Sequence, residues 1–186
     1  MSNARERILQ AAEELFAGAG FDATPTSRIA ERAGVPKGLV HYYFRRKPDL
    51  LSALVQRLPD EHVDPAHVVV TGDVAESLRR LVAELDRRLS SSRVLSHLLW
   101  READTHHAVR DALQERHGRL VAQVRAVILA AAAGGVALAD VDSASALLAL
   151  AVGYRHSVAR HASDERPGEM ERELTFVANA LTPRPT

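Results

Sequence analysis

The segment GVPKGLVHYYFRRKPDLL, residues 34–51, places two Lys, two Arg, one His and two Tyr among apolar residues. Ammonium and guanidinium groups bind phosphate oxygens, and tyrosine hydroxyls donate hydrogen bonds to the same atoms. The chain as a whole has a formal net charge of zero, because 24 Lys and Arg balance 24 Asp and Glu. This cluster is therefore either an ordinary solvated helix face or a surface suited to an anionic partner.

The charges are spread unevenly along the chain. Residues 1–47 hold eight Lys or Arg against five Asp or Glu, a net of +3, so residues 48–186 carry −3. The only two lysines, Lys37 and Lys47, both fall within the cluster. A small basic module on a mildly acidic body is a weak indication of nucleic-acid binding. A compositional preference for Arg explains the two lysines equally well.

Length and composition exclude several classes of protein. With 186 residues, 26% of them charged and 46% hydrophobic, the chain is typical of a globular protein with one core, or of a small module joined to a larger one. No apolar run reaches the roughly 18 residues that span a bilayer, and the N-terminus lacks a signal-peptide pattern. We expect a cytoplasmic protein without a membrane partner. The absence of Cys excludes disulfides, a thiol nucleophile and a Cys-based zinc site.

Apolar residues recur at helical spacing along the chain, which predicts an all-α fold. Ser2 or Asn3 is expected to cap the first helix, and Thr24 to cap a second helix that has Pro25 as its first residue. Residues 61–71 have no helical period and are interpreted as a connection, in which HVVV could be a short extended piece; the domain boundary is expected near residues 59–72. The predicted helices cover residues 4–18, 25–33, 37–43, 48–58, 73–90, 93–102, 106–132, 140–162 and 168–181.

Residues 25–44 have the pattern of a helix-turn-helix. This motif needs a small residue where its helices cross, a turn residue that tolerates positive φ, and apolar residues that lock the second helix. Ala30, Gly34 and Val40 fill the key positions, and Ile29, Ala33, Val35 and Tyr43 complete the apolar set. An ordinary pair of helices could also show this pattern. It would not explain the outward face of the second helix, which carries Lys37, Gly38, Leu39, His41 and Tyr42.

Residues 5–51 resemble the N-terminal DNA-binding domain of the TetR family of bacterial transcriptional regulators. The resemblance is continuous over about 47 residues. It includes ILQAAEELF, the Gly20-Phe21 turn, IAERAGV and the pattern YYF..K..LL, which leads into the fourth helix. It implies a helix-turn-helix domain over residues 1–47 and a helical effector-binding and dimerisation domain over residues 48–186. The helix at 48–58 would connect the two.

The resemblance also implies roles for individual residues. The third helix would enter the major groove, and the start of the second helix and the start of the fourth would meet phosphates. Leu39 and His41 differ from the commonest residues of the family, so the base preference of relatives does not transfer. Pro36 and the pair Arg45-Arg46 also depart from the usual pattern. The DNA-binding residues implied are Thr26, Ser27, Lys37, Gly38, Leu39, His41, Tyr42 and Lys47.

The second domain is expected to dimerise and to bind an effector. In the family, the last two long helices of each subunit form a four-helix bundle, although the same apolar residues could equally be intrachain core. Ligand sites are mostly apolar with a few convergent polar groups. The expected dimer residues are Leu147, Leu150, Tyr154, Val158, Leu174, Val177 and Leu181, and the pocket candidates are His97, Trp100, His106, His107, Tyr154 and His156.

The leading hypothesis is a ligand-responsive transcriptional regulator without enzymatic activity, cofactor or metal. It would act first of all as a repressor, binding a palindromic operator in double-stranded DNA as a homodimer and leaving it when a small-molecule effector binds. The alternative is a small all-α, His-rich, metal-dependent enzyme, since the chain has nine His. The chain lacks H-E-x-x-H or an equivalent spacing. A helical adaptor without DNA binding is a third class.

Overall fold

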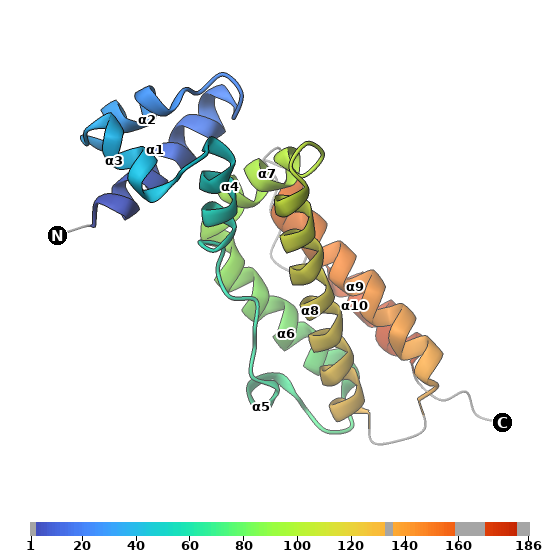
Figure 1. Cartoon of the computed structure of the whole chain (residues 1–186). Coiled ribbons are helices and arrows are strands. Elements are labelled where there is room, and N and C mark those ends of the chain that lie inside the picture. Colours follow the sequence, from blue (N-terminus) through green and yellow to red (C-terminus); the bar gives the residue numbers. More distant parts are fainter. Residues whose placement is uncertain (1–2, 133–135, 159–169, 182–186) are drawn as a thin grey trace. The chain divides into compact units, whose positions relative to one another are not determined.

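The computed structural model describes residues 3–132, 136–158 and 170–181, and within these ranges it contains helices and no β-strand (Figure 1). The prediction of an all-α fold is confirmed. Among the described residues, no helix is both long and apolar enough to cross a membrane. The helices are α1 (Ala4–Ala19), α2 (Thr26–Ala33), α3 (Lys37–Tyr43), α4 (Lys47–Val55), α5 (Pro65–Val68), α6 (Val74–Leu89), α7 (Arg93–Glu102), α8 (His107–Ala131), α9 (Leu138–Val158) and α10 (Glu171–Ala180), with a 3₁₀ turn at Ser90–Ser92.

The ends of the first two helices follow from local chemistry. Asn3 caps α1, because its Oδ1 accepts a hydrogen bond from the N–H of Arg5 at 3.3 Å. The prediction that Thr24 caps α2 is wrong. Pro25 occupies the cap position, and the buried Thr24 hydroxyl instead donates to the carbonyl of Gly20 at 2.7 Å. Thr24 therefore closes the α1–α2 loop.

The connection after α4 contains a short helix that the periodicity did not reveal. α5 begins at Pro65, and the Oδ1 of Asp64 accepts a hydrogen bond from the N–H of Ala66 at 2.9 Å. The extended alternative for HVVV is wrong, because His67 and Val68 belong to this helix and Val69 and Val70 form no strand. The Asp64-Pro65 pair, a cap residue followed by Pro at the first helical position, was the signal for it.

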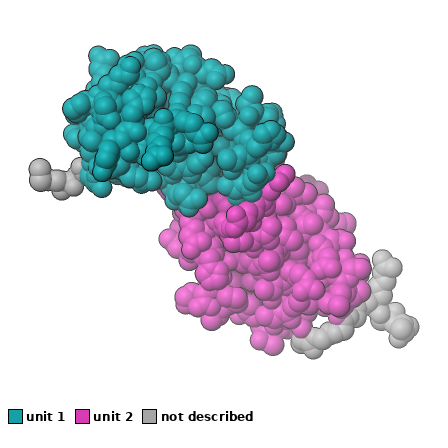
Figure 2. All heavy atoms as spheres, in the orientation of Figure 1, with its two compact units in different colours: residues 1–58, 94–113 teal, residues 59–93, 114–186 magenta. Residues whose placement is uncertain are grey.

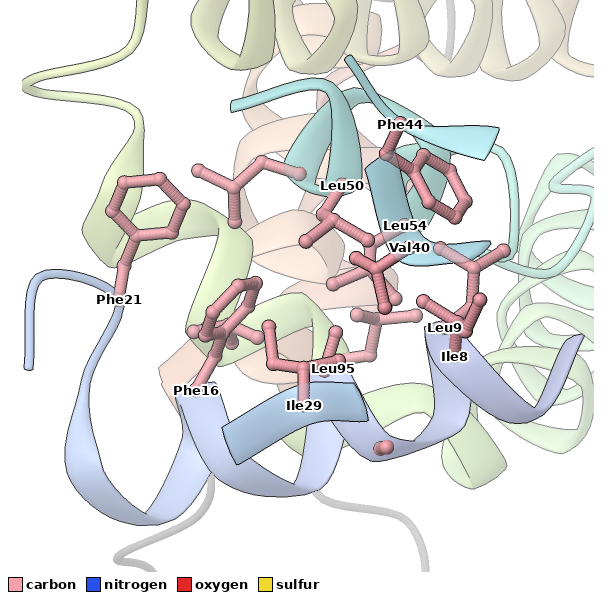
Figure 3. Packing of buried hydrophobic residues seen from close by; sticks show 14 of the residues in the cluster. Ile8, Leu9, Phe16, Phe21, Ile29, Val40, Phe44, Leu50, Leu54 and Leu95 are labelled. Carbon is pink, nitrogen blue, oxygen red and sulfur yellow. The ribbon is translucent and has the colours of Figure 1, made fainter. Parts of the chain in front are cut away.

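The chain forms two compact units (Figure 2). Unit 1 comprises residues 1–58 and 94–113. Its core joins α1–α4 to α7 and the start of α8, and Figure 3 shows Phe16, Ile29, Leu50 and Leu95 among the side chains that meet there. Two separate stretches of the sequence thus share one core, and the helix-turn-helix segment is folded on it.

Unit 2 comprises residues 59–93 and 114–186. Its core is built from α6, the later part of α8, α9 and α10, with Val63 and Val68 from the connection after α4. Leu78, Val127 and Val141 are fully buried in it. This division by packing differs from the division by role at residues 47 and 48, because Leu50, Leu51 and Leu54 of α4 lie in the core of unit 1. The division by role stays a prediction.

Candidate nucleic-acid interface

The turn between α2 and α3 depends on Gly34. Its φ of 63° and ψ of 43° place it in the left-handed region, as the sequence predicted for the turn residue. The N–H of Gly34 donates to the carbonyl of Glu31 at 3.1 Å, and that of Val35 to the carbonyl of Ala30 at 3.0 Å. These bonds satisfy the last carbonyls of α2 and fix the direction in which α3 begins.

Apolar side chains lock both helices of the motif onto α1 and α4. Ile29 and Ala30 are buried on the α2 side, and Val40 is fully buried on the α3 side. Phe44, the residue after α3, is also buried. Tyr43 differs from expectation, because 36% of it remains exposed and its ring packs between those of Tyr42 and Phe44. The motif therefore rests on Val40 and Phe44 more than on Tyr43.

The opposite face of α3 is open to solvent. Lys37, Gly38 and His41 are exposed, Tyr42 is 77% exposed, and Leu39 is half-buried. A Cβ placed on Gly38 would meet no other heavy atom within 4 Å, so the backbone there is uncovered. Among the described residues, no acidic side chain forms an ion pair with Lys37. Donors and one apolar side chain thus share a single short helix face.

The start of α2 presents further donors. Pro25 at the cap position provides no side-chain hydrogen bond to the first turn. Helix-internal bonds from this turn begin at Arg28, whose N–H donates to the carbonyl of Pro25 at 3.1 Å. The N–H groups and hydroxyls of Thr26, which is half-buried, and of Ser27, which is exposed, lie at the positive end of the helix. That combination suits a phosphate.

Lys47 begins α4 and folds back over the α1–α2 loop. Its Nζ lies 4.3 Å from the centroid of the Phe21 ring and donates to the carbonyl of Asp22 at 3.2 Å. The sequence did not predict this arrangement. An ammonium group has three protons, and the contact with Asp22 uses one of them. The remaining donors are available to a phosphate.

Three arginines lie near the end of α3. Arg45 and Arg46 are exposed, and the N–H of Arg46 donates to Oδ2 of Asp49 at 2.9 Å, which fixes the start of α4. The guanidinium carbon of Arg5 lies 5.5 Å from the centroid of the Phe44 ring. Sequence reasoning did not select Arg5. Arg5 is the second residue of α1, and nothing in the sequence around it indicates a contact with Phe44, which lies 39 positions later.

The six pocket candidates are not gathered in one unit. His97, Trp100, His106 and His107 belong to unit 1, whereas Tyr154 and His156 belong to unit 2. Trp100 is 56% exposed, and a ring nitrogen of His107 lies 2.9 Å from the guanidinium of Arg110. His106 packs edge-on against Phe21, with ring centroids 4.6 Å apart. Among the described residues, no three His, Asp or Glu side chains form a group that could hold a metal ion.

His156 is the most buried of these candidates in its unit. It is 5% exposed, and its Nε2 lies 2.9 Å from Oδ1 of Asp86 on α6. Arg155 donates to the other oxygen of Asp86 at 2.5 Å. Within the described part of the chain, the buried Nδ1 of His156 has no hydrogen-bond partner. This is the type of polar atom that a ligand would satisfy.

The expected dimer residues divide into two groups. Leu174 and Leu181 are buried in the core of unit 2, and Val177 is partly buried against it. Leu147, Leu150 and Tyr154 are 62%, 57% and 65% exposed and share one side of α9. Phe176 on α10, which sequence reasoning missed, is 73% exposed. The side chain of Val158 lies outside the described part of the structure.

Comparison with known proteins agrees with this arrangement. The family described as "Bacterial regulatory proteins, tetR family" matches residues 8–54. The HTH-type transcriptional regulator TtgR of Pseudomonas putida is 32% identical over 88 residues, which are 46% of this chain and 42% of that protein. The HTH-type transcriptional repressor BepR of Brucella suis is 31% identical over 83 residues, 38% of this chain and 40% of that protein. The chain thus spans about two-fifths of the length of these curated relatives.

Solved structures resemble the chain over almost its whole length. AmtR of Mycobacterium smegmatis aligns with a TM-score of 0.64 and 28% identity, covering 97% of this chain and 86% of that one. GusR of Salmonella enterica aligns with a TM-score of 0.69 and 21% identity, covering 96% and 95%, and shows the fold alone. Residues 8–54, which include α2, Gly34 and α3, therefore match the TetR family of bacterial regulatory proteins, and the fold of the chain resembles that of AmtR over almost its whole length.

Proposed function

We propose that the protein is a ligand-responsive transcriptional regulator that binds a palindromic operator as a dimer, with repression as its default action. The observation that carries the proposal is the exposed face of α3, where Lys37, His41 and Tyr42 project from a helix whose other side is locked by Val40. A helix of this size can enter the major groove, and its polar side chains can reach base edges and phosphates.

A dimer is part of the proposal because one short recognition helix reads too few base pairs for useful affinity. The exposed leucines and Tyr154 of α9 support it, since an apolar strip of this kind on a solvent face is typical of a protein–protein contact. We infer that Leu147, Leu150, Tyr154 and Phe176 meet their equivalents in a second copy. Leu174 and Leu181 instead hold α10 to its own subunit.

The effector is proposed to bind in unit 2. It would act by binding more tightly to one of two conformations of the protein than to the other. A ligand shifts such an equilibrium only by its difference in affinity for the two states. His156 is the candidate contact, because it is buried and its Nδ1 lacks a partner in the described structure. Because Nε2 faces Asp86, Nδ1 is the ring nitrogen through which His156 would form a hydrogen bond with a ligand.

The proposal is tested by selecting bound sequences from a pool of randomised duplex DNA at moderate salt. An inverted repeat should be recovered, whose half-sites lie about one helical turn apart or a multiple of it. Leu39→Ala should change the bases preferred at one position of each half-site, because the proposed role of Leu39 is to contact a thymine methyl. A selected pool without any common sequence would contradict the proposal.

A further inference from the structure

Lys47 is held more firmly than a surface lysine. Its ammonium group lies over the face of Phe21 at 4.3 Å and donates to the carbonyl of Asp22 at 3.2 Å. A lysine side chain otherwise samples many rotamers, and ordering it on binding reduces affinity. The cation–π contact and the hydrogen bond already order the Lys47 side chain. Lys47 therefore loses less conformational entropy when it binds a phosphate.

Phe21 is in turn held by residues from two distant parts of unit 1. It lies in the loop between α1 and α2 and is 6% exposed. Phe16 packs against it with ring centroids 5.1 Å apart, and the His106 ring packs against it in a T-shaped arrangement, with centroids 4.6 Å apart and an interplanar angle of 72°. His106 immediately precedes α8, so the corner between α7 and α8 forms one wall of the Phe21 site.

Polar contacts fix the same corner to α1. The guanidinium of Arg101 donates to the carbonyl of Phe16 at 3.3 Å and to Oε1 of Glu102 at 3.2 Å. The N–H of His106 donates to the carbonyl of Glu102 at 3.0 Å, and its Nε2 lies 3.9 Å from Oε2 of Glu102. The position of the His106 ring is therefore set by backbone and side-chain contacts together.

We propose that Phe21 and His106 are positioning residues for DNA binding: the α7–α8 corner holds Phe21, and Phe21 holds Lys47 in the conformation that contacts a phosphate. This inference rests on the proposed function, since it assumes that the partner is duplex DNA. It adds that a residue more than 50 positions after the recognition helix sets the affinity for DNA without touching it.

The test measures binding to a fluorescein-labelled duplex of mixed sequence by anisotropy over a series of salt concentrations. Lys47→Ala should weaken binding and make the plot of log affinity against log salt shallower by about 0.9 per subunit for each phosphate that is no longer neutralised. His106→Gln and Phe21→Leu should each weaken binding about two- to tenfold, the range expected when a flexible side chain must be ordered on binding. His106→Gln added to Lys47→Ala should cause no further decrease in affinity.

Matched variants separate positioning from general destabilisation. His106→Phe keeps the aromatic edge and should bind like the original protein. His107→Gln changes the neighbouring histidine, which contacts Arg110 and not Phe21, and should also bind normally. Thermal unfolding by circular dichroism shows that each variant is folded at the temperature of the measurement.

The outcomes are distinguishable. If His106→Gln and Phe21→Leu bind like the original protein, or if His106→Gln weakens Lys47→Ala by the same factor again, the positioning role is wrong. If Lys47→Ala alone has no effect, the phosphate contact is wrong while the proposed function stands. If the unaltered protein binds no duplex, the proposed function fails and the inference with it.

Discussion

Asp86 on α6 and His156 on α9 are 70 positions apart in the sequence, yet Oδ1 of Asp86 lies 2.9 Å from Nε2 of His156. The second oxygen of Asp86 accepts a hydrogen bond from Arg155 at 2.5 Å. One carboxylate therefore joins the last turn of α6 to the last turns of α9 inside unit 2. The contact has a structural consequence that is independent of any ligand.

Replacing Asp86 should destabilise unit 2. In Asp86→Ala the Nε2 of His156, which is buried, loses its partner, and the free energy of unfolding should fall by about 1–3 kcal/mol. Urea unfolding followed by circular dichroism measures the change. Asp142→Ala is the matched control, because Asp142 is 60% exposed and, among the described residues, pairs with Arg125. Its effect should be about 0–1 kcal/mol, and equal effects of the two variants would contradict the assignment.

The same carboxylate should contribute to acid denaturation. Burial raises the pKa of Asp86, but the hydrogen bonds from His156 and Arg155 and their charges lower it by more, so the net pKa lies below the ordinary value of 3.8. A carboxylate with a lowered folded-state pKa adds stability above its unfolded pKa, and that stability is lost as the pH falls through the folded pKa. Urea midpoints of the original protein should therefore decline more steeply below about pH 4 than those of Asp86→Asn. Parallel declines would show that another group is responsible.

Glu61 has a comparable role in the connection after α4. It is 6% exposed and pairs with Arg116 at 2.6 Å and Arg119 at 2.8 Å. Burial lowers the pKa of Arg116 despite the neighbouring carboxylate, so the loss of that carboxylate leaves a half-buried cation unpaired. Glu61→Ala should lower the free energy of unfolding by about 3 kcal/mol, the lower end of the range for breaking a buried pair.

Glu115 provides the control for Glu61. It pairs with the same Arg119 at 3.0 Å but is 76% exposed, so Glu115→Ala should change the stability by less than about 1 kcal/mol. Guanidinium chloride would screen these ion pairs, and urea is therefore the denaturant to use. If both variants lose the same stability, burial of Glu61 does not determine its contribution.

Much of the fold follows from local rules that the sequence displays. Apolar spacing located the ends of the long helices to within a few residues where the structure describes them, whereas the predicted ends at residues 162 and 168 lie outside the described residues. Gly34 was recognisable because only a residue that tolerates positive φ fits the turn. Pro48 similarly marked the start of α4. Burial of Ile29, Ala30 and Val40 was predictable from the same pattern. Each of these features depends on residues within a few positions of one another.

Contacts between distant segments were not predictable in this way. The position of Lys47 over Phe21, of His106 against Phe21 and of Asp86 beside His156 each depends on how separate helices pack. Thr24 was assigned to the cap by its residue type, whereas the packing of the loop turned its hydroxyl towards Gly20. Tertiary packing therefore decided those details of the candidate site that a single helix could not reveal.

Two glycines of the motif should respond oppositely to alanine. At Gly34, with φ of 63°, a Cβ forces a left-handed conformation that costs about 1–2 kcal/mol, so Gly34→Ala should destabilise unit 1. Gly38 lies within α3 with open space around it, and Gly38→Ala should raise the stability by about 0.5–1 kcal/mol. The added methyl of Gly38→Ala should nevertheless weaken DNA binding, because it lies on the face proposed to enter the groove. Thermal unfolding and anisotropy on duplex DNA measure the two effects separately, and tight binding by Gly38→Ala would mean that the backbone does not approach the DNA there.

The exposed side of α9 should determine the oligomeric state. Leu147→Glu and Leu150→Glu place charges on residues that are 62% and 57% exposed, so the fold of a single subunit should keep its stability while a dimer would have to bury unpaired carboxylates. Sedimentation equilibrium should show a monomer for both variants, and their affinity for an inverted repeat should fall towards that for a single half-site. Leu138→Glu is the control, because Leu138 is 60% exposed on the same helix but nine residues before Leu147, which places it on the opposite side. This variant should remain dimeric.

If the protein stays dimeric with either substitution on the Leu147 side, the interface lies elsewhere. If only Leu138→Glu dissociates the dimer, the interface lies on the opposite face of α9.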